Sequence, residues 1–197
     1  MRMIVNEENI EVKDTEWQEK IEKCWEELYD DIDFLYPNNA GETFFSVIWS
    51  MSKNAFDMDR EVQVVIDSKN ELYISVGTPG FVSFADQEGQ LPGMKLPLRC
   101  WIHTHPFGTA FWSGTDWKTI KTWRPVLQSA IVLGDNEYLA MNVENYVGKK
   151  VYYGIMEEPD TIVEYKTEEE ELSRIQESQS EMSTEEAMKV MNGDDEE

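Results

Sequence analysis

The chain has 197 residues, of which 41% are hydrophobic and 12% aromatic, so it is long and apolar enough to bury the core of one globular domain. Its formal net charge of −23 argues against nucleic acid as a partner, because the phosphates would be repelled, and equally against an anionic membrane surface. A partner with a basic face fits this charge, and adaptation to high salt is a second explanation of it.

No targeting or membrane-spanning segment is expected. The first twelve residues, MRMIVNEENIEV, contain no long apolar run and become acidic at once, which is not typical of a signal peptide. No apolar run approaches the ~20 residues needed to span a bilayer, so no membrane insertion is expected. The only two cysteines, Cys24 and Cys100, are interpreted as free buried thiols, which favours the cytoplasm or another reducing compartment.

The N-terminal part of the chain predicts a strand and then a long helix. Residues 3–12 are predicted to form a short strand or hairpin. Thr15 and Gln18 make a capping box, which is a helix-start signature. Apolar residues then repeat at intervals of three and four up to about Tyr36, and Pro37 ends the predicted helix.

The middle of the chain predicts strands separated by turns. An apolar segment rich in β-formers begins at Gly41 and is headed by Glu42. Residues 62–66 and 72–76 predict two strands joined by a tight turn. Residues 77–97 are broken by glycine and proline and predict a long loop, a kind of segment that is usually functional or mobile.

The C-terminal part predicts more strands and then a tail. The predicted strands span residues 130–133, 138–143, 151–155 and 162–165. From Thr167 onward the chain is acidic, has no aromatic residue and ends in DDEE, which is typical of a helical or disordered tail. The predicted organisation is therefore one catalytic domain over residues 1–166 and an acidic tail over residues 167–197.

Both histidines of the chain lie in the stretch from Leu98 to Trp123. His103 and His105 are two residues apart at the end of an apolar run that predicts a strand, so their side chains share one face, about 6.6 Å apart along the chain. After a short loop, Ser113 and Asp116 open a predicted helix. Two imidazoles and a carboxylate make up three of the four ligands of a tetrahedral zinc site.

Each half of this pattern also has an ordinary structural explanation. Ser-x-x-Asp is a helix N-cap signature, and two histidines on a strand can be satisfied by hydrogen bonds. Taken together, a pair of histidines at ligand spacing and a nearby carboxylate predict metal binding. Cupins, metallo-β-lactamases and amidohydrolases need further histidines, and this chain has none. The predicted site therefore has an open fourth position, which is typical of catalytic zinc.

His103, His105, Ser113 and Asp116 stand as H-x-H-x7-S-x-x-D, which resembles the signature of the JAMM (MPN+) zinc metalloproteases. The wider string WIHTHP-x-x-TAF-x-S-x-x-D is similar to the endosome-associated deubiquitinases of that family. Over roughly residues 15–165 the match is one of element order only. The chain lacks the extra His and Cys ligands that those relatives use for a second, structural zinc, so no linkage selectivity follows.

The resemblance implies an α/β (α+β) fold of the MPN/JAMM type, in which a curved mixed β-sheet is flanked by helices, similar to the cytidine-deaminase-type architecture. It implies one Zn2+ per chain, held by His103, His105 and Asp116, and hydrolysis of peptide or isopeptide bonds in ubiquitin or ubiquitin-like conjugates. The alternatives are a JAMM peptidase that processes a sulfur-carrier or viral structural protein, and a non-catalytic MPN scaffold.

The family also has a catalytic glutamate at the start of the strand after the first long helix. Glu42 is predicted to be this general base, although Phe45 stands where the family often has a glycine. Glu88, in the loop upstream of the histidines, is the alternative base, and an ordinary acid beside a turn is the structural alternative for Glu42. Ser113 is predicted to donate a hydrogen bond to the oxyanion of the substrate.

Overall fold

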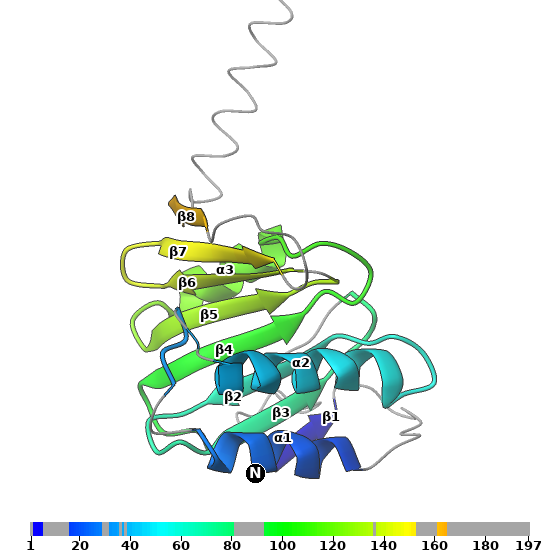
Figure 1. The fold of residues 1–197 in the computed structure, drawn as a ribbon. Coiled ribbons are helices and arrows are strands. Elements are labelled where there is room, and N and C mark those ends of the chain that lie inside the picture. The colour runs from blue at the N-terminus through cyan, green and yellow to red at the C-terminus, as the bar shows by residue number, and fades with distance from the viewer. Residues whose placement is uncertain are drawn as a thin grey trace, which may run out of the picture. The chain divides into compact units, whose positions relative to one another are not determined.

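A mixed β-sheet runs through the computed structural model (Figure 1), which describes residues 2–5, 16–28, 32–35, 37, 39–80, 93–135, 137–152 and 161–164. In these residues the sheet has eight strands in the order β1-β3-β2-β4-β5-β6-β7-β8. The strands are β1 (Arg2–Val5), β2 (Val62–Ile66), β3 (Leu72–Val76), β4 (Leu98–Thr104), β5 (Leu127–Leu133), β6 (Glu137–Asn142), β7 (Val147–Tyr152) and β8 (Thr161–Glu164). All of them belong to one compact unit, Met1–Glu164.

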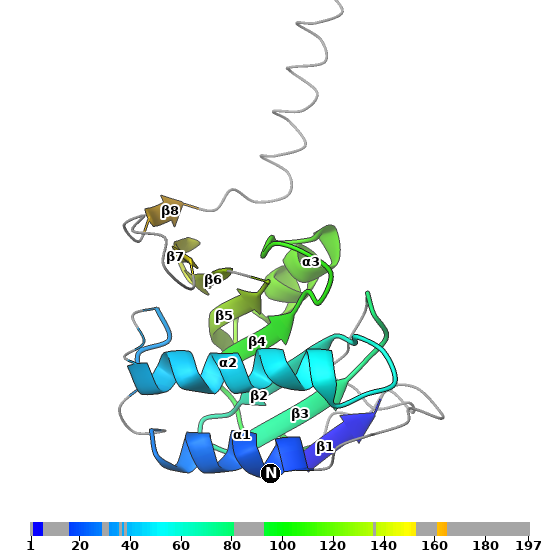
Figure 2. The ribbon, with the colours of Figure 1, turned by 45° about the vertical axis from the view of Figure 1, so that its right-hand side comes forward.

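Two strand pairs are parallel, β1 with β3 and β4 with β5, and the other neighbours are antiparallel. Parallel neighbours need a crossover connection, and the connection from β4 to β5 contains helix α3 (Gly114–Trp123). Figure 2 shows the strands turning progressively from β1 to β8, which is the ordinary twist of a large sheet.

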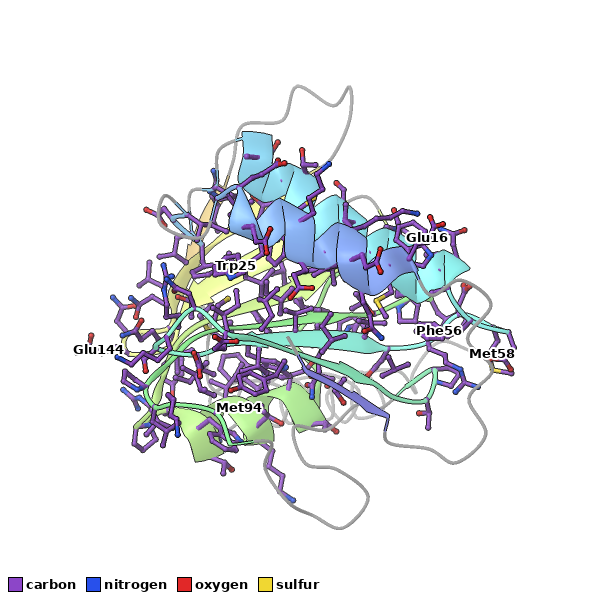
Figure 3. The ribbon with its side chains drawn as sticks, turned by 90° about the horizontal axis from the view of Figure 1, so that it is seen from below. Glu16, Trp25, Phe56, Met58, Met94 and Glu144 are labelled. Atoms are coloured by element: carbon purple, nitrogen blue, oxygen red, sulfur yellow. The ribbon has the colours of Figure 1, made fainter. Side chains whose placement is uncertain are left out.

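Helices cover both faces of the sheet. Helices α1 (Glu16–Glu26) and α2 (Asn39–Asn54) lie on one face, and α3 lies on the other, as the view from below shows (Figure 3). The expected mixed α+β fold, with a mixed sheet flanked by helices, is therefore confirmed.

Strand alternation decides which side chains meet which helices. The buried cluster against α1 and α2 takes Val64 from β2, Ile102 from β4 and Ile131 from β5. Because successive strand residues point to opposite faces, Gln63 and His103 point to the face that α3 covers. The metal-ligand candidates thus lie on the opposite face from the main apolar core.

The predicted strand headed by Glu42 is wrong, because this segment is helix α2. Its fully buried residues Phe44, Phe45, Ile48 and Met51 recur at intervals of three and four, which is the helical period. The aromatic and β-branched composition favoured a strand, but packing against α1 and the sheet decides the conformation. The first predicted helix is also shorter than expected, since α1 ends at Glu26.

The other predicted strands agree with the structure to within a few residues. The predicted strands at 62–66 and 72–76 coincide with β2 and β3, whereas β5 begins three residues before the predicted start at residue 130. Glu88, most of the predicted loop and the tail from 167 lie outside the described residues.

Cys24 and Cys100 are both free, as expected, but only Cys100 is fully buried, whereas Cys24 is half-buried. No helix within the described ranges is both long and apolar enough to cross a membrane.

Candidate metal centre

The side chains of His103, His105 and Asp116 converge on one point. His103 Nε2 lies 3.1 Å from Asp116 Oδ1, and His105 Nε2 lies 3.4 Å from Asp116 Oδ2. One ligand atom from each residue lies within 4.8 Å of the others. Two ligands bound at ~2.0–2.1 Å to a tetrahedral ion are roughly 3.3 Å apart, so these separations suit a shared metal ion.

The fold brings the three side chains to one edge of the sheet. His103 is near the C-terminal end of β4, and His105 follows it, with its main-chain N–H donating to Leu133 O at 2.8 Å. The connection from β4 to β5 then places the N-terminus of α3 beside this C-terminal end of β4. Asp116 is fixed by a capping box: Asp116 N donates to Ser113 Oγ at 3.1 Å, and Ser113 N donates to Asp116 Oδ2 at 2.7 Å.

All three candidate ligands are buried, with exposed fractions of 1% for His103, 9% for His105 and 6% for Asp116. Among the residues that the structure describes, neither ring nitrogen of His103 has a partner in good hydrogen-bond geometry, although Nε2 lies 3.1 Å from Asp116 Oδ1. Buried polar atoms without partners are costly and uncommon. A metal ion would bind both an imidazole nitrogen and a carboxylate oxygen that point at the same place. The residues present therefore fit a metal ion.

The protonation states also suit metal ligands. Burial lowers the pKa of His103, and the nearby Asp116 only partly opposes this shift. Burial alone would raise the pKa of Asp116, but His103 and His105 outweigh burial and hold this pKa below its usual range. The hydrogen bond from Ser113 N favours the same ionised carboxylate. A neutral imidazole and an ionised carboxylate are the forms that bind metal.

A buried pair of side chains holds the ring of His103 in place. The Trp101 ring stacks on the His103 ring, with centroids 4.3 Å apart and planes 10° apart. Trp101 Nε1 donates to Gln63 Oε1 at 2.9 Å, and Gln63 lies opposite His103 in the β2–β4 ladder. Such outer contacts fix ligand orientation in metal sites. Gln63 was missed in the sequence, since no local signal predicts which residue pairs with His103.

Glu61, which immediately precedes β2, is the acid that the structure places beside this group. It is buried, with an exposed fraction of 9%, and it lines a cleft together with His105 and Ser113. Burial raises the pKa of Glu61 to about 7, an effect that His105 opposes and Asp116 reinforces. The sequence signal for Glu61 was its position as an acid at the start of a strand that follows a helix. This signal was hidden because α2 was interpreted as a strand.

The structure does not bring Glu42 to the candidate ligands. Glu42 is in the first turn of α2, whereas Lys53, at the other end of α2, donates a hydrogen bond to Pro106 O at 2.7 Å. Glu42 and Lys53 are eleven positions apart along the helix, which is a rise of about 16 Å along the axis. Ser113, by contrast, is in the site, where it caps α3 and lines the cleft.

The cleft beside the ligands has a volume of about 380 Å³. It is lined by Glu61, Pro79, Gly80, His105, Pro106, Phe107, Gly108, Phe111, Ser113 and Thr115. A larger groove of about 820 Å³ lies at the opposite ends of β4 and β5 and contains none of the candidate ligands. The chemistry of the lining residues, and not the size of the hollow, therefore identifies the smaller cleft as the candidate active site.

Comparison of the chain with protein-family models finds no match, and comparison with curated protein sequences finds none either. The functional assignment therefore depends on the site residues and on the motif that they form.

Gly134→Ala is expected to weaken zinc binding by about tenfold or more, the usual effect of disturbing residues around the ligands. A Cβ on Gly134 would lie 2.3 Å from Ala110 N and 2.7 Å from Thr109 C, so the loop between His105 and Ser113 would have to move. Competition with a chromophoric chelator measures the zinc affinity. Gly80→Ala is the control, because no atom of the described residues lies within 4 Å of its added Cβ. Equal zinc affinity of Gly134→Ala and wild type would contradict a role of Gly134 in positioning the loop between His105 and Ser113.

In metal-free protein, Glu61→Gln should raise the melting temperature at pH 8 and leave it nearly unchanged at pH 4. The folded-state pKa of Glu61, about 7, is above its unfolded value, so the folded state binds this proton more tightly. The resulting stabilisation is present at low pH and is lost as the pH rises through about 7. Thermal unfolding in chelator at both pH values tests this, and an equal shift at both would contradict the burial of an ionisable Glu61.

Proposed function

We propose that the chain is a zinc-dependent hydrolase of the JAMM type, with His103, His105 and Asp116 as the protein ligands of one zinc ion per chain. The observation that carries this proposal is the buried group of two imidazoles and one carboxylate, in which each imidazole Nε2 lies 3.1–3.4 Å from a carboxylate oxygen, beside a cleft that also contains Glu61. Nitrogen ligands favour zinc over magnesium or calcium, which prefer oxygen. Three protein ligands with a fourth position left open are typical of catalytic zinc.

The proposed reaction is hydrolysis of an amide bond. When bound, zinc would supply Lewis acidity and make water a nucleophile at neutral pH. The carboxylate of Glu61 takes one proton from the attacking water, whose oxygen bonds to the acyl carbon. The C–N bond then breaks, and Glu61 returns that proton to the leaving nitrogen. A carboxyl whose pKa burial raises to about 7 suits both transfers.

Ser113 and Trp101 have supporting roles in the proposed reaction. The Ser113 oxygen accepts from Asp116 N, so its hydroxyl hydrogen is directed elsewhere and can donate to the substrate oxyanion. Removal of one such donor typically costs ~10²–10³ in rate. The stacked Trp101 ring keeps water away from the buried side of His103.

The motif resemblance makes conjugates of ubiquitin or ubiquitin-like proteins the first substrates to test. The negative charge of the chain would complement a basic face on such a partner. A peptidase acting on another protein is the alternative enzyme, and a scaffold without catalysis is the alternative from another class. The free Cys24 and Cys100 support a reducing compartment such as the cytoplasm as the location.

The test is to incubate zinc-loaded protein with a panel of ubiquitin-like conjugates and internally quenched peptides. We expect hydrolysis of at least one member, its loss in chelator and its return on addition of zinc. A protein that binds one zinc per chain and hydrolyses no amide would favour the scaffold. Hydrolysis that is insensitive to a chelator would contradict the metal mechanism.

A further inference from the structure

Two aromatic rings are exposed at the candidate active site. Phe107 has an exposed fraction of 66% and Phe111 one of 54%, and both line the cleft that contains Glu61 and His105. In the described part of the chain, only Met58 and Leu96 are comparably exposed among large apolar side chains. Exposed aromatic rings that gather at one cleft mark a binding surface more often than scattered apolar residues do.

The loop that carries these rings is anchored at several points. Lys53 Nζ donates to Pro106 O at 2.7 Å and lies 5.7 Å from the centre of the Phe107 ring. Asp135 N donates to Gly108 O at 2.9 Å. The Phe111 ring centre lies 4.6 Å from that of His105. The loop backbone and the Phe111 ring are thus held in place before any ligand arrives, which reduces the entropy cost of binding.

The lining of the cleft favours an apolar group. Besides the two phenylalanines, Pro79 and Pro106 contribute apolar surface, and the only charged or titratable side chains that line it are Glu61 and His105, among the residues that the structure describes. A charged substrate side chain packed against the rings would lose part of its hydration, which is costly. The volume of about 380 Å³ suits a short chain segment, since pockets for small ligands span ~300–1,000 Å³.

We propose that this cleft binds an extended polypeptide segment whose residue next to the scissile amide has a bulky apolar side chain, packed between Phe107 and Phe111. The inference rests on the proposed hydrolase function, because it takes the amide to be cleaved beside His105 and Glu61. It goes further by naming the property of the substrate that the cleft selects, and it favours the peptidase over the isopeptidase, because the isopeptide bond of a ubiquitin conjugate joins a glycine to a lysine side chain. In the part of the chain that the structure describes, no ring contact joins Phe107 to a candidate metal ligand. Its proposed role is therefore to bind the substrate.

The experiment uses internally quenched peptides that differ only at the two positions flanking the scissile bond, with Phe, Leu, Ser or Asp there. With zinc-loaded protein, kcat/KM should be at least about tenfold higher for Phe or Leu than for Ser or Asp at one of these positions. Phe107→Ser should remove most of this preference by raising KM, with little change in kcat or zinc content. Phe107→Leu should restore it in part. Leu96→Ser is the matched control, because Leu96 is as exposed as Phe111 but lies at the other end of β4.

A binding measurement separates failure of this inference from failure of the proposed hydrolase. Zinc-loaded Glu61→Gln protein should bind a fluorescent peptide with Phe or Leu at the preferred position about tenfold more tightly than its Ser counterpart, and added Phe107→Ser should abolish the difference. Cleavage without preference, or a preference that Phe107→Ser leaves intact, would overturn the inference and leave the hydrolase standing. Selective binding with no cleavage of any peptide by the wild type would support the binding cleft and contradict the hydrolase.

Discussion

Glu61→Gln is expected to lower kcat for amide hydrolysis by roughly 10²–10⁴, the usual contribution of a general base, while zinc content stays at one per chain. Glutamine keeps the size of the side chain and its hydrogen-bonding capacity but cannot accept the proton of the attacking water. Glu42→Gln is the matched control, because Glu42 lies in the first turn of α2, away from the cleft, and its rate should remain near that of wild type.

The pH profile gives a second measure of the same group. Burial raises the pKa of Glu61 to about 7, and a zinc ion nearby favours the carboxylate, so the wild type should lose activity on an acid limb below pH 7. Glu61→Gln should lack that limb. If Glu42→Gln were inactive and Glu61→Gln active, the assignment of the base from the structure would be wrong.

Asp116→Asn is expected to reduce zinc affinity by at least about 10², and His103→Ala should abolish stoichiometric binding. Three protein ligands leave no redundancy, and a neutral amide is a poor replacement for a carboxylate beside a cation. The side-chain amide oxygen in the Asp116→Asn variant can still accept the hydrogen bond that Ser113 N donates to the wild-type carboxylate, so α3 should stay capped.

Ser113→Ala separates the loss of a ligand from the loss of the helix cap. It removes the acceptor for Asp116 N, which costs stability of ~0.5–2 kcal/mol, but it removes no metal ligand. Isothermal titration with zinc should therefore show near-wild-type stoichiometry for Ser113→Ala and weak binding for Asp116→Asn. Full zinc content in His103→Ala, or an unchanged zinc affinity of Asp116→Asn, would contradict the assigned ligands.

The candidate ligands could be predicted because their signal is local. The two histidines are two residues apart on one strand, and the Ser-x-x-Asp pattern both caps a helix and orients its carboxylate. The crossover between parallel strands then brings the two segments to the same edge of the sheet, a geometry that follows from general topology. These residues therefore meet in the structure as the spacing predicted.

The acid beside the ligands could not be placed in the same way. Its identification depends on which strand follows the helices, and the composition of α2, rich in aromatic and β-branched residues, favoured a strand at that point. Once α2 is a helix, the first strand after it is β2, and the acid before that strand is Glu61. The position of Gln63 beside His103 follows from the register between β2 and β4. The two residues are 40 positions apart in the sequence, and no local pattern encodes such a pairing.

The zinc site is tested most directly by anomalous scattering at the zinc absorption edge from crystals of the zinc-loaded protein. The proposed site predicts one strong peak per chain, about 2.0–2.2 Å from His103 Nε2, His105 Nε2 and a carboxylate oxygen of Asp116, with its remaining coordination position facing the cleft. The absence of a peak among these three atoms under zinc saturation, or zinc bound only at exposed carboxylates elsewhere, would contradict it.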